Sequence, residues 1–416
     1  MYNVSVNSKK GVVFVAKKLA VIGAGASGLV GAIEAKIEYP KAEITIFERL
    51  QKPGKKLLVT GNGRCNFANE DLSPKHFYGN NEFLRGVLTS PHADTENYFR
   101  NLGVLAYHED GRIYPRSQQS ATIRDTLISK ALSLDIKIAT EVSVLSIKTN
   151  GKGFKINGEY FDAVIIAGGG KATPVHGSDG SCLKLLKDMG YEATALYPAL
   201  CGLTTKEKFI NSLKGVRAEA KAMLYSGDRL LGEELGEVQF TENAISGIPV
   251  MNLSHLCKSN KALCLKLDLC NELSESELKE HFREVKTSSP DAKTELVLSG
   301  IVNIKLGYAI MKMLNIKAET AIEALTQRSI EQIIDILKCF EISITGTKDF
   351  NSAQITCGGI KTEQIDVKTM MSKLHPGLFI CGEILDIHGD CGGYNLHLAW
   401  TTGRIAGNGA AEFLKG

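Results

Sequence analysis

A chain of 416 residues is long enough for roughly two to three structural units. Its hydrophobic share of 44% and charged share of 23% are those of an ordinary globular protein and exclude a disordered chain. The formal net charge is only +3, and the basic residues are spread along the chain without a Lys/Arg block. We therefore expect a small-molecule ligand and no nucleic-acid partner.

The ten cysteines lie at irregular spacing without a CxxC pair, and no histidine cluster has zinc-ligand spacing. We therefore predict no metal site, no disulfide framework and a cytoplasmic location, and we interpret Cys257, Cys264 and Cys270 as packing residues. No apolar run approaches the ~20 residues that span a bilayer, so no membrane segment is expected. The apolar stretch 11–16 is short for a signal peptide, and residues 1–17 are interpreted as an N-terminal tail or an extra strand.

The first strong pattern is a short apolar strand at residues 19–22. It leads into a glycine-rich run from Gly23 to Gly28 and then into an apolar helical pattern that ends before Pro40. A second strand follows at residues 44–47. This succession is typical of a βαβ unit with parallel strands, so we predict an α/β fold.

The GxGxxG spacing in this context predicts a dinucleotide site. Gly23 permits a tight turn, Gly25 lets the backbone approach a pyrophosphate, and Gly28 lets the helix pack on the strand. Glu48, twenty positions after Gly28, would accept hydrogen bonds from the ribose. A structural turn that binds nothing is the alternative. The predicted contacts are Gly23, Gly25, Ala26, Ser27, Gly28, Glu48 and Arg49.

A second glycine-containing loop runs from Thr60 to Asn66. Its small residues and Arg64 could contact phosphate or flavin oxygens, or the loop could be only a tight turn. A simple NAD-dependent dehydrogenase, which would be colourless, does not need such a loop, so we favour FAD. The predicted contacts here are Lys56, Thr60, Gly61, Gly63, Arg64, Cys65 and Asn66.

Two later apolar strands, at residues 163–167 and 378–381, also run into glycines. Ligands of open α/β sheets bind beyond the carboxyl ends of the strands, so three such strands predict one shared crevice. The predicted lining residues from these strand ends are Ala167, Gly168, Gly169, Gly382 and Glu383.

The C-terminal segment carries Gly392, Gly393, Tyr394 and Asn395 ahead of an apolar helical pattern. A helix that begins at Gly392 would direct its N-terminal amides into the crevice and stabilise an anionic reduced flavin. We predict these four residues as cofactor contacts. The alternative is a connection that only closes the sheet.

Between these parts the pattern changes to short alternating runs followed by helices. Ser274 with Glu277, and Ser329 with Gln332, have the spacing of capping boxes. This change in the hydrophobic pattern indicates an inserted second domain that begins near residue 196. The predicted divisions are an FAD-binding domain at 18–195 and 348–416 and an inserted substrate domain at 196–347.

Three blocks carry a resemblance to a known family: GAGASGL, KKLLVTGNGRCNFAN and GEILDIHGDCGGYNLHLAWTTGRIAG. With the segments from Asp110, Gly177 and Phe240, they resemble the BaiN-like, or aminoacetone-oxidase-like, bacterial NAD(P)/FAD-dependent oxidoreductases over nearly the whole chain. The resemblance implies a Rossmann-type FAD-binding domain, split between the two ends of the chain, with an inserted strand-rich domain carrying a small helical portion. It also implies that Val142 contacts the adenine.

The sequence departs from that family at three places. Thr241 to Ala244 stand where relatives often have His or Tyr followed by Gly, which leaves substrate contacts there in doubt. Cys391 precedes one glycine pair and Cys357 another, and a packing role is favoured for both over redox activity, because reactivity needs an exposed thiolate.

Together these patterns predict an FAD-dependent oxidoreductase that transfers a hydride between flavin and a small-molecule substrate. No second GxGxxG follows a strand, so the electrons would come from transiently bound NAD(P)H, from the substrate or from a partner. Reduction of an activated C=C bond and oxidation of an amine are both open. Arg112, His388 and Tyr394 are candidate liners of the substrate pocket without an assigned catalytic role. A flavin-binding sensor or partner-binding protein (tRNA or protein) without independent turnover is the alternative.

Overall fold

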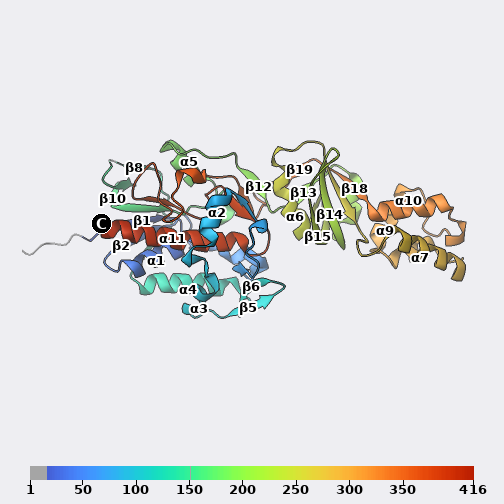
Figure 1. Cartoon of the computed structure of the whole chain (residues 1–416), viewed down its shortest axis with the longest axis horizontal. Helices are drawn as coiled ribbons and strands as arrows, with labels where there is room; N and C mark the ends of the chain where they lie inside the picture. Colours follow the sequence, from blue (N-terminus) through green and yellow to red (C-terminus); the bar gives the residue numbers. More distant parts are fainter. Residues whose placement is uncertain (1–15, 150) are drawn as a thin grey trace, which may run out of the picture.

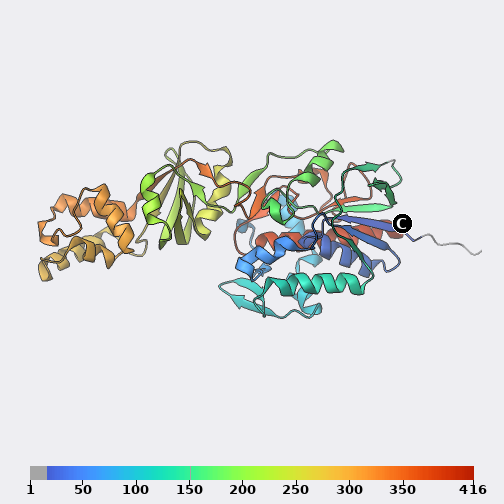
Figure 2. The ribbon, with the colours of Figure 1, turned by 180° about the vertical axis from the view of Figure 1, so that it is seen from behind.

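The computed structural model describes residues 16–149 and 151–416. Nearly all of the N-terminal tail or extra strand expected at residues 1–17 lies outside the described chain. Figure 1 shows an elongated molecule with an α/β part, an antiparallel sheet beside it and a helical part at the far end. Figure 2 shows the same succession from behind.

A five-stranded parallel sheet forms the centre of the α/β part, with the order β21-β11-β1-β2-β7. Its strands are short and apolar because both faces are covered. The strands are β1 (Lys18–Ile22), β2 (Glu43–Phe47), β7 (Lys137–Ala139), β11 (Ala163–Ile166) and β21 (Leu378–Ile380). Since β1, β11 and β21 are parallel neighbours, their carboxyl ends lie at one edge, as the glycines predict.

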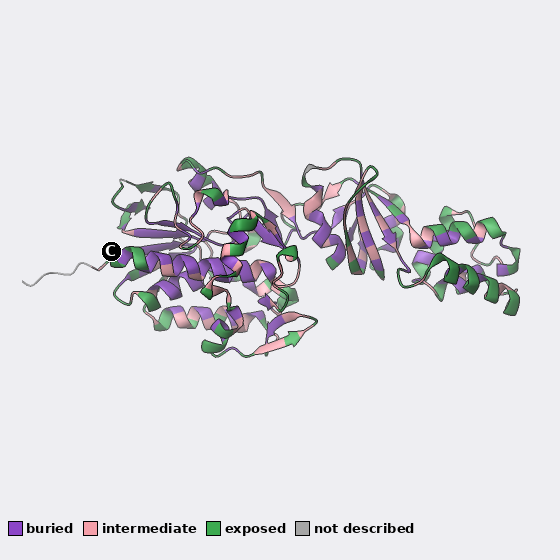
Figure 3. Ribbon diagram, viewed as in Figure 1, coloured by how far each residue is buried: buried purple, intermediate pink, exposed green. Residues whose placement is uncertain are grey.

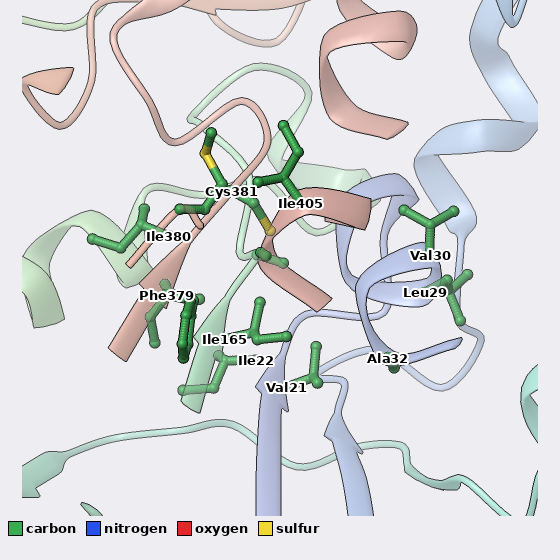
Figure 4. Packing of buried hydrophobic residues seen from close by; sticks show 14 of the residues in the cluster. Val21, Ile22, Leu29, Val30, Ala32, Ile165, Phe379, Ile380, Cys381 and Ile405 are labelled. Carbon is green, nitrogen blue, oxygen red and sulfur yellow. The ribbon is translucent and has the colours of Figure 1, made fainter. Parts of the chain in front are cut away.

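Two helices from opposite ends of the chain cover this sheet together. They are α1 (Ala26–Glu38) and α11 (Tyr394–Lys415), and α4 (Ser120–Ser133) packs outside α1. Figure 4 shows Leu29 and Val30 on α1, Ile405 on α11, and Ile165 and Phe379 on strands of the sheet, which all belong to one hydrophobic core. The C-terminal segment therefore completes the layer that the N-terminal segment begins.

The middle of the chain forms a second sheet with its own hydrophobic core. The seven strands, in the order β18-β17-β14-β15-β16-β13-β19, pair antiparallel. Their bounds are β13 (Leu203–Thr204), β14 (Arg217–Ser226), β15 (Arg229–Thr241), β16 (Ala244–Ser246), β17 (Leu263–Asp268), β18 (Phe340–Ile344) and β19 (Gly346–Thr347). The predicted fold class is confirmed, whereas the boundaries of the domains stay predictions.

A helical part is attached between β17 and β18. It contains α7 (Glu275–Ser288), α8 (Thr294–Ser299), α9 (Ile304–Met313) and α10 (Gln327–Lys338). Figure 3 shows that buried residues follow the two sheets, whereas these helices expose much of their surface. The helix α6 (Ile248–Leu253) lies apart from them, against β15 on the side of the α/β part.

The remaining elements form small sheets and connections around the parallel sheet. The additional strands are β3 (Ala68–Asn69), β4 (Phe77–Gly79), β5 (Ala106–Glu109), β6 (Arg112–Pro115), β8 (Ile147–Thr149), β9 (Phe154–Ile156), β10 (Glu159–Phe161), β12 (Tyr197–Ala199), β20 (Ile355–Cys357) and β22 (Ile387–Gly389). The additional helices are α2 (Asn81–Leu88), α3 (Thr95–Asn101) and α5 (Ser181–Asp188). Short 3₁₀ helices include η1 (Lys55–Gly63), η2 (Pro74–His76) and η6 (Ser254–Ser259).

The helix starts test the sequence predictions directly. The capping box of Ser274 and Glu277 is confirmed at the start of α7. The prediction for Ser329 and Gln332 is wrong: Thr326 caps α10, and its hydroxyl accepts a hydrogen bond from the Ser329 amide at 3.1 Å. The sequence offers two hydroxyl residues three positions apart, and the first one lies where the chain turns into the helix.

The start of α11 also differs from the prediction. The helix begins at Tyr394 and not at Gly392. Gly392 and Gly393 have φ values of 140° and 95°, which lie outside the helical region. The glycine pair therefore forms the turn into the helix, and its amides still precede the first helical residues.

Candidate cofactor and substrate site

A cavity of about 880 Å³ lies beyond the carboxyl ends of β1, β11 and β21. Its walls include the loops after these strands, the loop of η1 and the start of α11. It also reaches Ile248 and Met251 of α6, the helix that packs against β15, so the middle part of the chain contributes to the same space. This is the crevice that the strand ends predict.

The first glycine loop leaves its backbone open to the cavity. Gly23 has φ 102°, and a Cβ there would lie 2.5 Å from the Ala167 carbonyl oxygen. Only glycine therefore fits where this loop passes close to the backbone of Ala167. A Cβ on Gly25 would have no atom within 4 Å, because this position borders the open cavity. Gly28 does not line the cavity; a Cβ there would lie 1.9 Å from the Gly23 carbonyl oxygen. Gly28 thus serves the packing of α1 on β1.

Glu48 is held by the backbone at the end of β2. It is buried, and its Oε2 accepts from the Ala24 amide at 3.0 Å while its Oε1 accepts from the Leu50 amide at 2.8 Å. Its backbone carbonyl accepts from the Val142 amide at 2.9 Å, which brings Val142 to the same wall. This carboxylate is therefore fixed at the edge of the cavity and keeps lone pairs for a ligand hydroxyl.

Two oppositely charged residues of the cavity lining, from distant parts of the chain, form an ion pair. Lys56 Nζ donates to Glu383 Oε2 at 2.7 Å, and Glu383 Oε1 accepts from the Thr356 amide at 2.9 Å. Arg49 at the other end forms an ion pair with Asp179. These pairs place cationic and anionic groups in the same lining as the open backbone of the first loop.

The start of α11 also contributes to the lining. Gly392, Gly393 and Asn395 line the cavity, and the buried Oδ1 of Asn66, also in the lining, has no hydrogen-bond partner among the described residues. A buried polar atom without a partner costs free energy, so a ligand donor at this position would be favourable. The open loop, the fixed Glu48 and this unpaired amide oxygen fit a dinucleotide.

The structure brings most predicted residues into this one lining and leaves four outside it. The residues in the lining are Gly23, Gly25, Ala26, Ser27, Glu48, Arg49, Lys56, Thr60, Gly61, Arg64, Asn66, Val142, Ala167, Gly168, Gly169, Gly382, Glu383, Gly392, Gly393 and Asn395. Gly28, Gly63, Cys65 and Tyr394 lie outside it. Burial raises the pKa of the Cys65 thiol to about 12.

Tyr394 turns away from the cavity. Its ring stacks on His76 with centroids 4.6 Å apart and meets the edge of Phe77, because the first turn of α11 directs it toward η2 and β4. His388 also lies outside the lining; its ring stacks on Tyr78 at 5.1 Å, and burial lowers its pKa to about 3. The expectation that these two residues line the substrate pocket is therefore wrong.

Arg112 is the candidate liner that does reach the cavity. Two other arginines of the lining are paired: Arg49 with Asp179, and Arg64 with Glu109 at 2.7 Å. Arg112 has no ion-pair or hydrogen-bond partner for its guanidinium in the part of the chain that the structure describes. An unpaired guanidinium in a cavity is suited to an anionic or carbonyl oxygen of a ligand.

The cysteines beside the glycine pairs have thiol pKa values above the ordinary value. Burial raises the pKa of Cys357, and burial with the charge of Asp390 raises the pKa of Cys391 to about 12. Both thiols stay protonated near neutral pH. Cys357 is buried, whereas Cys391 is partly exposed and lines the cavity, so the packing role stays a prediction.

The cavity residues that were not predicted as contacts include Ile248, Met251 and Asp390. Asp390 stands two residues before Gly392, the first glycine of the pair ahead of α11. This closeness could have marked it as a candidate cavity residue. Nothing local marks Ile248 and Met251, because they reach the cavity only through the placement of α6 against the α/β part.

Over residues 16–149 and 151–416, no His, Cys, Asp and Glu side chains gather in a group that could hold a metal ion. No helix within these described ranges has the length and apolar character needed to cross a membrane.

The chain resembles characterised proteins over nearly its full length. It is 36% identical to the 3-dehydro-bile acid delta(4,6)-reductase of Clostridium scindens, covering 95% of this chain and 99% of that protein. It is 26% and 24% identical to the ribosomal RNA dihydrouridine synthases of Haemophilus influenzae and Escherichia coli, each over 92% of this chain and 95% of the relative. A solved quinol fumarate reductase of E. coli has a TM-score of 0.50 at 16% identity, covering 96% of this chain and 71% of that one, and shares the fold.

The fold and the cavity define a flavoprotein with a Rossmann-type cofactor domain, and FAD is its cofactor, as the second glycine loop indicates. Residues 17–409 match the family described as HI0933-like protein Rossmann domain, and the chain belongs to this family. It is an FAD-dependent oxidoreductase, so the predicted enzyme class is confirmed.

Proposed function

We propose that this oxidoreductase reduces a C=C bond conjugated to a carbonyl group in a small molecule. The observation that supports this proposal most strongly is the 36% identity to a delta(4,6)-reductase, which extends over nearly the full length of both chains. The two dihydrouridine synthases share this chemistry, because the uracil bond that they reduce is also conjugated to a carbonyl. When bound, FAD in its reduced form supplies the hydride.

The residues that hold the cofactor follow from the cavity. We infer that the amides of the first glycine loop and the N-terminus of α1 bind the pyrophosphate, and that Glu48 accepts from the ribose. Val142 lies at the adenine end, and Glu383, oriented by Lys56, accepts hydroxyl donors further along. The amides that open α11 favour negative charge at the other end.

The substrate end is set by α6 and β6. Ile248 and Met251 present apolar surface to a hydrocarbon, whereas the unpaired guanidinium of Arg112 can donate to a carbonyl oxygen. Hydride addition to an enone moves negative charge onto that oxygen, so a donor placed there stabilises the transition state. Arg112 thus orients the substrate and draws charge away from the carbon that receives the hydride.

The electron donor is proposed to be NADH or NADPH bound transiently. The chain has one GxGxxG after a strand, at Gly23, which serves FAD. Anaerobic mixing of the oxidised holoprotein with each nicotinamide should bleach the visible flavin absorbance with at least one of them. If neither does, the donor is a different reductant.

The reaction itself is tested with flavin reduced photochemically in the absence of oxygen. A steroid dienone should reoxidise the flavin and be recovered with two added hydrogens, whereas the matched saturated ketone should leave the flavin reduced. Failure of every conjugated enone to reoxidise the flavin would contradict the proposal and favour the alternative, a flavin-binding sensor or partner-binding protein without turnover.

A second candidate is reduction of uracil in RNA, which the two dihydrouridine synthases favour. The near-neutral formal charge of +3 gives this candidate no electrostatic support. Ribosomal RNA in the same anaerobic assay discriminates the two: reoxidation by RNA, with dihydrouridine formed and no reaction with the dienone, would select it.

A further inference from the structure

A line of hydrogen-bonded side chains connects the cavity with the surface. Asp390 lines the cavity and is only 5% exposed. Its Oδ2 lies 3.0 Å from Nδ1 of His76, and Nε2 of the same imidazole lies 3.1 Å from Oδ2 of Asp71. The Asp71 side chain is 47% exposed, so the line ends in water.

The imidazole in this line is held in place on both sides. The His76 ring stacks on Tyr394 with an angle of 18° between the planes. The second oxygen of Asp390, Oδ1, accepts a hydrogen bond from the Tyr78 hydroxyl at 3.0 Å. The carboxylate and the imidazole therefore stay aligned without a ligand.

The charged and titratable groups that surround this line of side chains are not expected to carry the transferred proton. Lys75 pairs with Asp71 at the surface end, and Glu234 of β15 faces Asp390, where burial and that charge raise its pKa. Burial lowers the pKa values of His255 on η6 and His388 on β22, so both stay neutral near pH 7. Burial and Asp390 raise the pKa of Tyr78, while Arg112 and Lys258 are the cations on this side.

We propose that Asp71, His76 and Asp390 deliver the proton that the proposed reduction consumes. The inference rests on the proposed function, in which hydride transfer alone is not enough. Addition of a hydride to one carbon of the C=C bond breaks the π bond and leaves an electron pair on the neighbouring carbon. A proton must form the second C–H bond there.

In this step Asp390, as the carboxylic acid, gives its proton to that carbon and becomes a carboxylate. His76 then returns a proton from Nδ1 to Asp390 and takes one from water at Nε2, beside Asp71. The hydride and the proton account for both added hydrogens, and the two electrons come from the reduced flavin. Asp390 is the proton donor, while His76 and Asp71 are positioning residues that act through it.

The test compares His76→Phe with His108→Phe. Phenylalanine keeps the stacking on Tyr394 but lacks both nitrogens. His108 is a matched control because it also contacts two carboxylates, Glu70 at 2.6 Å and Glu96 at 3.5 Å, and does not line the cavity. We expect His76→Phe to slow flavin reoxidation by the enone at least about tenfold, with flavin reduction by the donor unchanged.

Three readouts separate proton delivery from a merely structural role. The slowed step should show a larger solvent deuterium isotope effect and a shifted pH profile, and in His76→Ala, which leaves room for a free imidazole, added imidazole should restore part of the rate.

The outcomes distinguish the two proposals. If the wild-type reduced flavin does not react with any enone, the proposed function fails. If the wild type reacts but His76→Phe matches it in rate, isotope effect and pH profile, only proton delivery through His76 is overturned.

Discussion

At the scale of single residues, the cavity is defined by groups whose partners are already fixed and by groups that have none. Glu48 is bound by two backbone amides, and Lys56 is paired with Glu383. Arg112 and the amide oxygen of Asn66 are unpartnered among the described residues. Fixed groups give a site its shape, whereas unpaired groups in a cavity are the ones with most to gain from a ligand.

Glu48→Gln should weaken FAD binding about tenfold, because one carboxylate oxygen is replaced by an amide that cannot accept from both backbone and ribose. The measurement is fluorescence titration of flavin-free protein with FAD. Glu43→Gln, at the exposed start of β2, is the matched control. Equal affinity in Glu48→Gln and wild type would remove Glu48 from the site.

Arg112→Met should raise the KM for the enone substrate about tenfold or more, since a charged hydrogen bond is lost, while the rate of flavin reduction by the nicotinamide stays the same. Arg116→Met is the control, because Arg116 is exposed and lies over Tyr107, 5.4 Å from the ring centroid. A change confined to flavin reduction would contradict a role for Arg112 at the substrate.

At the scale of elements, α1 and α11 join the two ends of the chain through a close backbone contact. A Cβ on Gly403 would lie 2.4 Å from the Ser27 carbonyl oxygen, and one on Gly407 would lie 2.3 Å from the Gly31 carbonyl oxygen. Both helices begin at the cavity wall. This seam therefore sets the distance between the first glycine loop and the glycine pair before α11.

Gly403→Ala should lower the free energy of unfolding by about 1 to 3 kcal/mol, because the methyl group forces the helices apart. Gly307→Ala is the control: it has the same helix propensity gain, and its nearest atom, Leu298 Cβ, is 3.2 Å away. Denaturant unfolding of both variants measures the difference. Equal stability of the two would show that the seam tolerates a side chain.

The elements also show what a sequence can predict. The strand, glycine loop and helix at residues 18–38 follow from local spacing and were predicted correctly. The ion pair of Lys56 with Glu383, the direction of Tyr394 and the arrival of Met251 at the cavity depend on contacts between distant segments, which no local pattern carries. The cap of α10 was misplaced because Thr326 and Ser329 have equivalent local chemistry.

At the scale of the whole molecule, an aromatic cluster joins the α/β part to the antiparallel sheet and its connections. Tyr78 and His388 stack, and His255 of η6 lies 4.2 Å from the Tyr78 ring centroid. Neither ring nitrogen of His388 has a hydrogen-bond partner in the described chain. The contact therefore depends on a neutral imidazole between the two parts that enclose the substrate end of the cavity.

Protonation of His388 should weaken this contact. Its pKa is lowered from 6.5 to about 3 in the folded protein, so between these values the unfolded chain binds more protons. Stability is then full above about pH 6.5 and falls as the pH drops toward about 3. His388→Phe should reduce the loss of stability between about pH 7.5 and about pH 5, as measured by urea unfolding.

The exposed His281→Phe is the control for this pH dependence and should leave the slope unchanged. His397, whose pKa burial lowers to about 4, keeps part of the slope in both variants. An identical slope in wild type and His388→Phe would show that the cluster does not carry the acid sensitivity.

The most direct measurement of the central claim, that one cavity holds FAD with the substrate beside α6, is a crystal structure of the protein grown with FAD. We predict the pyrophosphate against the backbone of Gly25 to Ser27, the ribose at Glu48, and the flavin ring beside Gly392 and Gly393 with open space toward Met251 and Arg112. A flavin ring at any other place, or side chains filling this cavity in the presence of FAD, would contradict it.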